Sequence, residues 1–247
     1  MASFPNYKNK HRKESLFHPE DFVRYKNWSP KDFPKKVIIV YQRSSLRHFL
    51  RKYRGKYKKL NFTNGHVLFK YGNVGFIRMN GIGSPNAATL LEELMALGAR
   101  EFLSMGTAGG LQEEGIFIVD RAIRDEGTSH HYEPAAKYAY PDKELSERLG
   151  KIFEKKKIEY KKGTSWTIDA PYRETKAEIE KYRKEGVATV EMEASALFTV
   201  ARKKGAKISS ALVVSDILGK KWEPKFHHLD MRRSLNNIID AGIECLK

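Results

Sequence analysis

The sequence predicts an α/β fold, a three-layer α/β/α sandwich around a mixed, largely parallel central sheet. Apolar stretches of strand length alternate along the chain with stretches of helical periodicity, which is typical of strands joined by crossover helices. The strand candidates at 37–41 and 208–214 are almost entirely apolar, as expected for strands buried on both faces. No repeat or low-complexity linker interrupts the 247 residues. We therefore expect a single domain over 1–247, with a basic N-terminal arm at 1–16.

Local patterns place the individual elements of this sandwich. Valine, isoleucine and aromatic residues indicate strands, and apolar residues spaced three or four apart indicate helices. We expect strands at 37–41, 66–71, 74–79, 102–105, 116–123, 187–190 and 208–214. We expect helices at 85–97, 141–157 and 229–246, and another that begins near 192 and ends at the glycine at 205. Gly72 and Asn73 predict a hairpin turn between two of the strands.

The helix at 85–97 has the most specific boundary residues. Ser84 is a candidate N-cap because its hydroxyl can accept a hydrogen bond from a free backbone N–H of the first turn. Pro85 suits the first helical position, and Gly98 suits the residue after the last turn.

The composition describes a basic protein with enough apolar material for a core. Lys and Arg number 46 against 30 Asp and Glu, which gives a formal net charge of +16. Hydrophobic residues make up 40% of the chain, which excludes disorder throughout. Cys245 is the only cysteine, so we expect neither an intrachain disulfide nor a cysteine-rich zinc site, and a reducing, cytoplasmic location. No run of about 18 apolar residues and no apolar secretion signal is present, so we expect no membrane span.

Two clusters of basic residues suggest anion binding. One lies at 8–13 and the other at 47–59, where Tyr53 and Tyr57 alternate with cations. Cations beside aromatic rings can hold phosphates and stack on bases, which would suit a nucleic acid or an anionic small substrate. The same residues also suit an ordinary solvated basic surface. Both interpretations stay open from the sequence.

Three strand ends carry the residues that are best suited to chemistry. In α/β sheets, ligands bind at the carboxyl ends of the strands. The first such end is the expected glycine loop 106–110, where backbone N–H groups and the Thr107 hydroxyl can meet an anion. This loop matches neither the nucleotide-triphosphatase loop nor the dinucleotide fingerprint, and a purely structural turn is the alternative.

The other two strand ends carry carboxylates. Glu191 and Glu193 follow the strand at 187–190, and a carboxylate can accept two hydrogen bonds from a vicinal diol such as the 2′,3′-hydroxyls of ribose. The alternative is a pair of acids that favour a helix N-terminus. Asp216 follows the strand at 208–214 and is a candidate general acid, with an N-cap role as the alternative.

Taken together, these segments resemble a known family. The motifs NGIGSPNAATLLEEL, GTAGG, VEMEASAL and VVSD occur in the order and approximate spacing of the nucleoside phosphorylase family. This family includes the hexameric purine nucleoside phosphorylases and the uridine phosphorylases, and the likeness extends from Phe17 to the C-terminus. The resemblance implies a phosphorylase-like sandwich and an enzyme that cleaves nucleosides.

The resemblance also implies a role for each residue that matches a motif. The implied ribose-binding residues are Glu191, Met192, Glu193 and His18, the last reaching the 5′-hydroxyl in a neighbouring subunit's site. The implied phosphate contacts are the backbone around Gly106 and the Thr107 hydroxyl. Asp216 matches the acid that protonates N7 of a purine, and Tyr172 falls in the aromatic segment beside the base.

The chain departs from the family pattern at the phosphate site. Phosphorolytic members commonly carry an arginine where this chain has Ser104, and many carry GDPxR where this chain has YQRSSLR. Arg43 and Arg47 are therefore the candidates for phosphate, with Arg78 behind them. Hydrolytic relatives, which cleave methylthioadenosine or adenosylhomocysteine with water, also lack the first arginine.

The base is equally open, because RDEGTSHHYEP resembles the uridine-cleaving branch whereas Asp216 favours purines. Arg173 is a candidate for a uracil carbonyl.

The expected function is reversible phosphorolysis of a uridine or purine ribonucleoside to free base and ribose 1-phosphate. This would make the chain a pentosyltransferase that uses inorganic phosphate as co-substrate and needs no cofactor or metal. The resemblance implies a homo-oligomer, at minimum a dimer and in the usual family form a hexamer, with no specific nucleic acid partner. The alternatives are a nucleoside hydrolase of the same fold and a non-catalytic nucleotide or RNA binder.

Overall fold

The structure, a computed structural model, describes residues 4–28, 32–61, 65–219, 221–226 and 228–247. Its strands are β1 (Lys36–Val40), β2 (Lys58–Asn61), β3 (Val67–Tyr71), β4 (Val74–Arg78), β5 (Glu101–Gly110), β6 (Ile116–Asp125), β7 (Tyr138–Ala139), β8 (Lys161–Ile168), β9 (Val187–Glu191), β10 (Lys207–Leu218) and β11 (Trp222–Pro224). Its α-helices are α1 (Pro19–Tyr25), α2 (Arg43–Lys52), α3 (Ser84–Ala96), α4 (Lys143–Lys155), α5 (Lys176–Lys184), α6 (Ala194–Lys203) and α7 (Leu229–Leu246). Short 3₁₀ helices lie at η1 (Lys10–Arg12), η3 (Ser129–His131) and η4 (Pro171–Arg173).

Within these described ranges, the strands form one mixed eleven-stranded sheet. Its path is β11-β10-β6-β8-β9-β5-β1-β4-β3-β2, and β7 pairs with β6. Strand β1 runs parallel to both β4 and β5, and β5 runs parallel to β10. Because β5 also pairs with β9, the strands β5, β10, β6, β8 and β9 close into a ring. The end of β5 therefore has neighbours on both sides.

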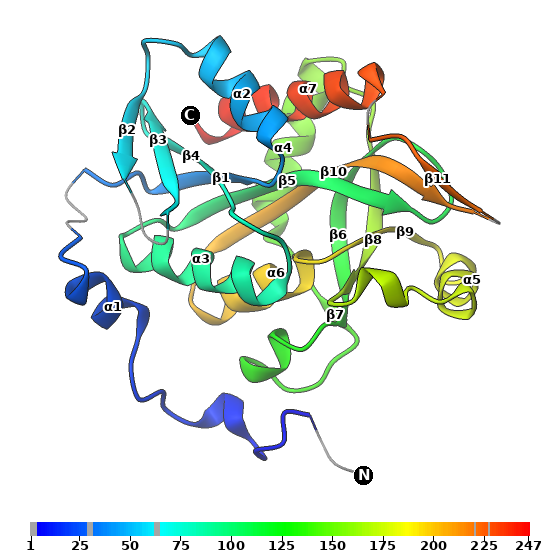
Figure 1. Ribbon diagram of the computed structural model, residues 1–247, viewed down its shortest axis with the longest axis horizontal. Coiled ribbons are helices and arrows are strands. Elements are labelled where there is room, and N and C mark those ends of the chain that lie inside the picture. The colour runs from blue at the N-terminus through cyan, green and yellow to red at the C-terminus, as the bar shows by residue number, and fades with distance from the viewer. Residues whose placement is uncertain (1–3, 29–31, 62–64, 220, 227) are drawn as a thin grey trace.

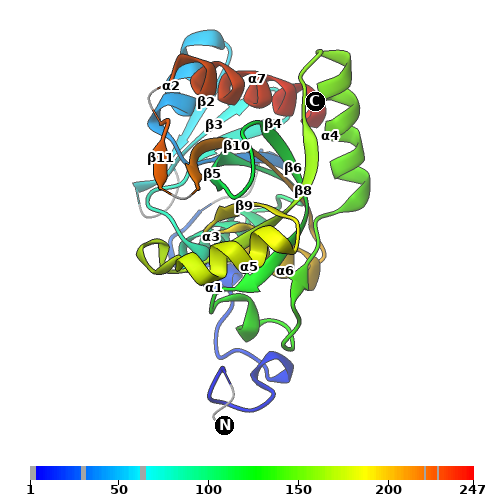
Figure 2. The ribbon, with the colours of Figure 1, turned by 90° about the vertical axis from the view of Figure 1, so that its right-hand side faces the viewer.

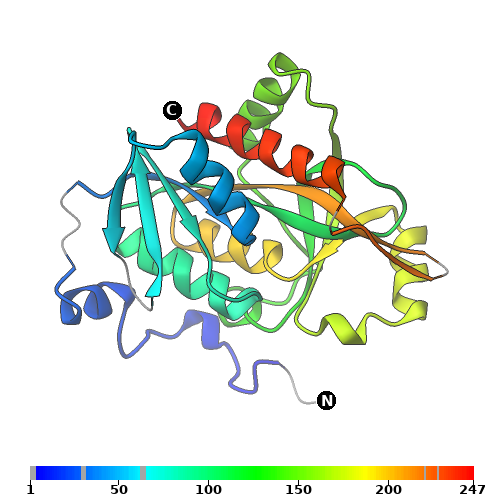
Figure 3. The same ribbon diagram turned by 45° about the horizontal axis from the view of Figure 1, so that its top comes forward.

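Helices cover both faces of the sheet, as Figures 1 and 3 show. On one face, α3 and α6 pack against each other over a core that includes Leu91, Leu94 and Phe198. On the other face, α2, α4 and α7 cover a second core that includes Phe49 and Phe153. Apolar residues at helical spacing account for both layers. The expected α/β/α sandwich with a mixed sheet is confirmed.

The N-terminal segment lies outside the sandwich. Helix α1 contacts α3, η1 contacts η3, and Figure 2 shows the segment extending beyond the helical layer. Leu16 is fully exposed and Phe17 is 71% exposed. In the described part of the chain, no helix combines the length and the apolar character that crossing a membrane requires.

Three expected boundaries were wrong, and each error lies near the candidate site. The glycines expected to form a loop after residue 105 are part of β5, which continues to Gly110 because β9 and β10 pair with it there. Strand β10 likewise continues past Val214 through a bulge, so Asp216 lies within it. Ser84 is the first residue of α3, and Gly83 occupies the N-cap with φ 96°, a left-handed value that favours glycine.

The two tyrosines of the second basic cluster do not form an exposed surface on which bases could stack. The Tyr53 ring lies 5.1 Å from Phe49, and the Tyr57 ring meets Phe69 edge-on at 5.3 Å. Both tyrosines are partly buried and pack against the core beneath α2. This arrangement favours the interpretation of the cluster as a solvated basic surface.

We expect Gly109→Ala to destabilise the fold by ~1–3 kcal/mol through overpacking. A Cβ at Gly109 would collide with Leu218 Cδ1 and would lie 3.0 Å from Val190 Cγ1, so these two side chains would have to shift. Denaturant unfolding of the variant and the wild type measures the difference. Gly219→Ala is the matched control, because a Cβ there meets only ordinary contacts at 3.5 Å and beyond, and should change stability by less than ~0.5 kcal/mol. Equal stability of the two variants would contradict this account of the ring.

Candidate active site

Strand pairing brings the three predicted strand ends to one place. In the sheet register, Gly109 of β5 faces Val190 of β9 on one side and Asp216 of β10 on the other. Because β9 is antiparallel to β5, the chain beyond Val190 runs back towards Thr107. A Cβ at Gly109 would lie 3.6 Å from Asp216 Oδ2, which shows how close the aspartate is to β5. Thr107, Glu193 and Asp216 therefore surround one short stretch of β5.

Glu193 is held at the start of α3. This residue is 8% exposed, and its Oε1 accepts a hydrogen bond of 2.6 Å from the backbone N–H of Gly83. The Ser84 hydroxyl donates to the carbonyl of Met192 at 2.7 Å, which fixes the neighbouring residue to the same helix. Burial, followed by the negative charge of Glu191, raises the pKa of Glu193 above its ordinary value. The positive end of the α3 dipole offsets part of this cost.

Glu191 has a different environment, because protein donors engage both of its oxygens. Oε1 accepts from Thr167 at 2.6 Å and from Ser165 at 3.1 Å. Oε2 accepts from the backbone N–H groups of Glu193 at 2.7 Å and Ala194 at 2.6 Å. Burial raises the pKa of Glu191, and these donors oppose the shift by stabilising its ionised form. Glu191 thus orients the loop that carries Glu193, and its direct contact with ribose stays a prediction.

The predicted phosphate end contains an aromatic side chain in place of the family's arginine. The Tyr41 hydroxyl is hydrogen-bonded to Ser104 Oγ at 2.7 Å, and its ring lies against Gly106, 2.7 Å from where a Cβ would stand. Burial, followed by the charge of Glu193, raises the pKa of Tyr41. Beside it, Thr107 Oγ1 accepts a hydrogen bond of 2.9 Å from Gln42 Nε2. Tyr41 therefore packs against the glycine strand at Gly106 and Ser104.

The candidate arginines lie at the edge of this arrangement. Arg43 is the first residue of α2, directly after Gln42, and Arg47 follows one turn later. Both are exposed, and α2 has no acidic residue in its first turn. Arg78 instead donates to the carbonyl of Met79 and to the side chain of Asn80. The hydrogen bond from Gln42, the N-cap of α2, thus brings the start of this helix beside Thr107.

The base end is built around Asp216. Its Oδ1 accepts from Ser215 Oγ and its Oδ2 from Trp222 Nε1, both at 2.8 Å. The predicted base contacts Tyr172 and Arg173 lie in η4 and are exposed, Tyr172 completely. The next residue, Glu174, is partly buried, and its burial and the charge of Asp216 raise its pKa to about 7.

His18 is not brought to the Glu193 carboxylate within one chain. It is the exposed N-cap of α1 and, with Phe17, lines a cavity of about 1080 Å³ between the N-terminal segment and the body. Its predicted contact with ribose would have to be made in another subunit, and stays a prediction.

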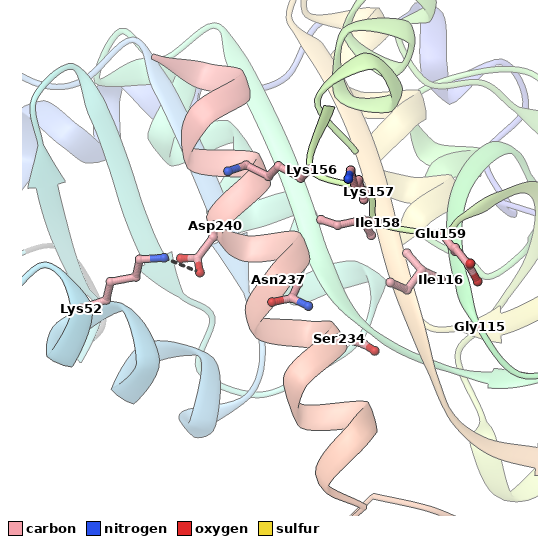
Figure 4. Close-up of a pocket in the computed structure, with 10 residues that line it drawn as sticks. All are labelled: Lys52, Gly115, Ile116, Lys156, Lys157, Ile158, Glu159, Ser234, Asn237 and Asp240. Carbon is pink, nitrogen blue, oxygen red and sulfur yellow. Dashed lines mark hydrogen bonds and ion pairs between the residues drawn. The ribbon is translucent and has the colours of Figure 1, made fainter. Parts of the chain in front are cut away.

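A second cavity of about 640 Å³ lies in the layer formed by α2, α4 and α7 (Figure 4). It is lined by Lys52, Asp240, Asn237 and Lys156, among others, and contains none of the predicted site residues. Lys52 is paired with Asp240 at 2.7 Å, and Lys156 with Glu244 at 2.7 Å. These pairs satisfy the charges of Lys52 and Lys156.

Four residues beside the predicted site were not identified from the sequence. Tyr41 and Gln42 follow the first strand, so their position at a carboxyl end could have drawn attention to them. Trp222 lies in a segment without a recognisable motif, and only the folded chain brings it to Asp216. Glu174 directly follows the predicted base contacts Tyr172 and Arg173 but was not itself singled out.

Comparison with known proteins identifies the family of the chain. Residues 46–247 match the model of the phosphorylase superfamily. The guanosine phosphorylase of Halorubrum lacusprofundi is 33% identical over 138 residues, which cover 54% of this chain and 57% of that protein. The purine nucleoside phosphorylase of Plasmodium vivax is 30% identical over 173 residues, which cover 67% of this chain and 70% of that protein.

A solved structure shows the same fold over almost the whole chain. The AMP nucleosidase of Bacteroides thetaiotaomicron superposes with a TM-score of 0.76 at 22% identity, covering 93% of this chain and 97% of that one. The family match spans Thr107, Glu193 and Asp216, the three residues that the sheet gathers around β5. On the length of this match, the chain belongs to the phosphorylase superfamily.

Proposed function

We propose that the chain is a nucleoside phosphorylase, a pentosyltransferase that moves the ribosyl group of a ribonucleoside to inorganic phosphate. The products would be the free base and ribose 1-phosphate. The observation that carries the proposal is the gathering of Thr107, Glu193 and Asp216 around one stretch of β5. An anion contact, a diol acceptor and an acid beside the base are what cleavage of this bond requires.

Glu193 would hold the ribose. Its carboxylate is fixed by Gly83, and its remaining lone pairs can accept the 2′- and 3′-hydroxyls together. Met192, which is partly exposed, would pack against the sugar. Fixing the diol orients the ring so that C1′ faces the acceptor, which removes orientational entropy from the barrier.

Phosphate would bind beside Thr107 and the backbone of Gly106, at the N-terminus of α2. The first turn of this helix offers unpaired N–H groups, and Arg43 and Arg47 add positive charge. As the C1′–N bond lengthens, positive charge develops on the ribose and negative charge on the base. A bound phosphate anion would stabilise the first, and the groups around Asp216 would relieve the second.

Hydrolysis by the same fold is a second candidate, favoured by one contact. The Tyr41 ring covers Gly106 and bonds to Ser104, where phosphorolytic relatives have an arginine. A neutral phenol there would leave less room and less positive charge for phosphate, so water would be the acceptor.

Assembly would complete the ribose site. The exposed Leu16 and Phe17 directly precede His18, and burying them against a second copy would carry this histidine to a neighbouring site. We propose a homo-oligomer with a dimer as the minimum unit and a hexamer as the full assembly. A cytoplasmic location would keep the buried Cys245 reduced.

We expect release of free base from inosine, adenosine or uridine to depend on inorganic phosphate. Ribose 1-phosphate should appear in equal amount, because phosphate is the acceptor in the proposed reaction. A coupled assay of base and sugar phosphate, with phosphate present or removed, measures both. Turnover at the same rate without phosphate, with free ribose as product, would replace phosphorolysis by hydrolysis.

We expect Glu193→Gln to lower kcat/KM by about 10²-fold or more. The amide keeps an acceptor for Gly83 but loses the charge that strengthens two hydrogen bonds to the diol, each contributing about 1.5–3 kcal/mol. Steady-state release of base measures the loss. Glu180→Gln, an exposed substitution of the same kind on α5, should leave the rate unchanged. A 2′,3′-dideoxynucleoside should be an equally poor substrate for wild type and Glu193→Gln.

The pH dependence should report the ionisation of Glu193. The protonated carboxyl accepts hydrogen bonds poorly, so activity should fall as pH is lowered through its pKa. Because burial raises this pKa, the fall should begin at a higher pH than for an ordinary carboxyl group. A profile of kcat/KM against pH measures it, and an acid limb unchanged in Glu193→Gln would assign the limb to another group.

A further inference from the structure

The segment 124–134 contains a buried carboxyl group that the proposed reaction does not use. Glu126 directly follows β6 and is 3% exposed. Its Oε1 accepts a hydrogen bond of 2.9 Å from the Ser195 hydroxyl, and its Oε2 accepts one of 2.9 Å from the backbone N–H of Ser129. Both serines are fully buried. Glu126 is thus enclosed by the protein, and it ties the end of β6 to the first turn of α6.

Arg124 holds the other side of this arrangement. Its Nε donates to the Ser129 hydroxyl at 2.8 Å, and its terminal nitrogens donate to the carbonyls of Pro134 at 2.7 Å and Glu133 at 3.2 Å. A planar guanidinium with several donors in a fixed geometry suits such a clamp. Because this clamp fixes the segment that carries the Ser129 N–H, Glu126 is held in place before any substrate binds.

The first turn of α6 is capped by side chains from outside the helix. A helix leaves its first backbone N–H groups without intrahelical partners, and the side chain of the N-cap residue commonly accepts from one of them. Glu193 is the N-cap of α6 but makes no such bond. Instead, the N–H of Ala194 donates to Glu191 Oε2 at 2.6 Å. The N–H of Ser195 donates to Thr167 Oγ1 at 3.0 Å. These two acceptors leave the Glu193 carboxylate free for the ribose diol of the proposed reaction.

Ser195 joins these two sets of hydrogen bonds, since its hydroxyl donates to Glu126 and its N–H donates to Thr167. The Thr167 hydroxyl in turn donates to Glu191 Oε1 at 2.6 Å. Glu191 Oε2 accepts from the N–H of Glu193 at 2.7 Å. Every step between Glu126 and Glu193 is therefore a hydrogen bond between buried groups. A buried polar network whose members are satisfied makes the local structure rigid.

Resting on the proposed function, we infer that Glu126 is a positioning residue for Glu193. It fixes Ser195 and with it the first turn of α6, so that the donors of this turn stay with Glu191 and Thr167. The Glu193 carboxylate then keeps the orientation in which it can accept both ribose hydroxyls. Without Glu126 the first turn would move, and Glu193 would compete to cap its own helix. The network would act in the same way for phosphorolysis and for hydrolysis, because both require the sugar to be held.

The test is a double-mutant cycle with Glu193→Gln. We expect Glu126→Ala and Ser195→Ala each to lower kcat/KM by ~10–10²-fold, because a small misplacement of a group that orients the substrate has an effect of this size. In the Glu193→Gln background the same changes should cost less than ~2-fold, because their effect passes through the carboxylate that is already lost. Release of base from inosine, adenosine and uridine, with phosphate present, measures each rate.

Two further variants serve as controls. Ser210→Ala removes another buried serine hydroxyl, one that has no hydrogen-bond partner among the described residues, and should change the rate in neither background. Glu126→Gln should keep most of the activity. Its amide oxygen can accept from the N–H of Ser129, and its amide nitrogen can donate to the Ser195 hydroxyl, which rotates to accept.

The outcomes separate this inference from the proposed function. Equal losses in the two backgrounds would overturn the inference and leave the proposed function standing, since a general structural defect adds to the loss of Glu193. Rates for Ser195→Ala equal to those for Ser210→Ala would do the same. A wild type that cleaves none of the three nucleosides would overturn the proposed function and the inference with it. Unfolding midpoints show whether Glu126→Ala folds, and if it does not, Ser195→Ala decides the outcome.

Discussion

The candidate site depends on the way β5 is paired on both sides at Gly109. A residue with a side chain at that position would displace the side chains of Leu218 and Val190, which occupy the space where a Cβ would lie. The register of β5 with both neighbours lets an acid from β10 and a carboxylate beyond β9 face the same stretch of strand. Gly109 of the GTAGG motif therefore serves the packing around β5, and the proposed anion contact at Thr107 lies on the same strand.

Glu191 and Glu193 are both buried, and their environments differ in how well they stabilise an ionised carboxylate. An ionised carboxylate without partners is expensive to bury, and Glu191 avoids that cost by accepting four hydrogen bonds. Glu193 has a backbone donor from Gly83 but also lies beside the charge of Glu191, so its ionised form is less well stabilised. Hydroxyl groups from a sugar would supply the missing donors. The proposed contact of Glu193 with the ribose diol depends on this difference between the two carboxylates.

Much of this arrangement could be predicted from the sequence, and the limits have physical causes. Helix α7 has the predicted bounds because its apolar stripe is local. The three motifs meet, as predicted, but through the pairing of β5 with β9 and β10, which continues past the strand ends expected from the sequence. The contact of Tyr41 with Gly106 joins residues far apart in the chain, and no local pattern encodes it. Strand β11 consists of three exposed residues and has no apolar periodicity. The sequence therefore predicts neither its pairing nor the hydrogen bond from Trp222 to Asp216.

The charged residues around the candidate site determine which reacting group it would stabilise and where phosphate would have to bind. Glu174, Glu191, Glu193 and Asp216 gather around it, and no ion pair joins any of them to a lysine or arginine across the ranges that the structure describes. Such surroundings stabilise a ribose that becomes positive in the transition state, but they repel a phosphate dianion. The net charge of +16 attracts anions to the surface, yet beyond about 8 Å salt screens it. In the proposed reaction phosphate would therefore have to be held by close donors, and the first turn of α2 with Arg43 would provide them.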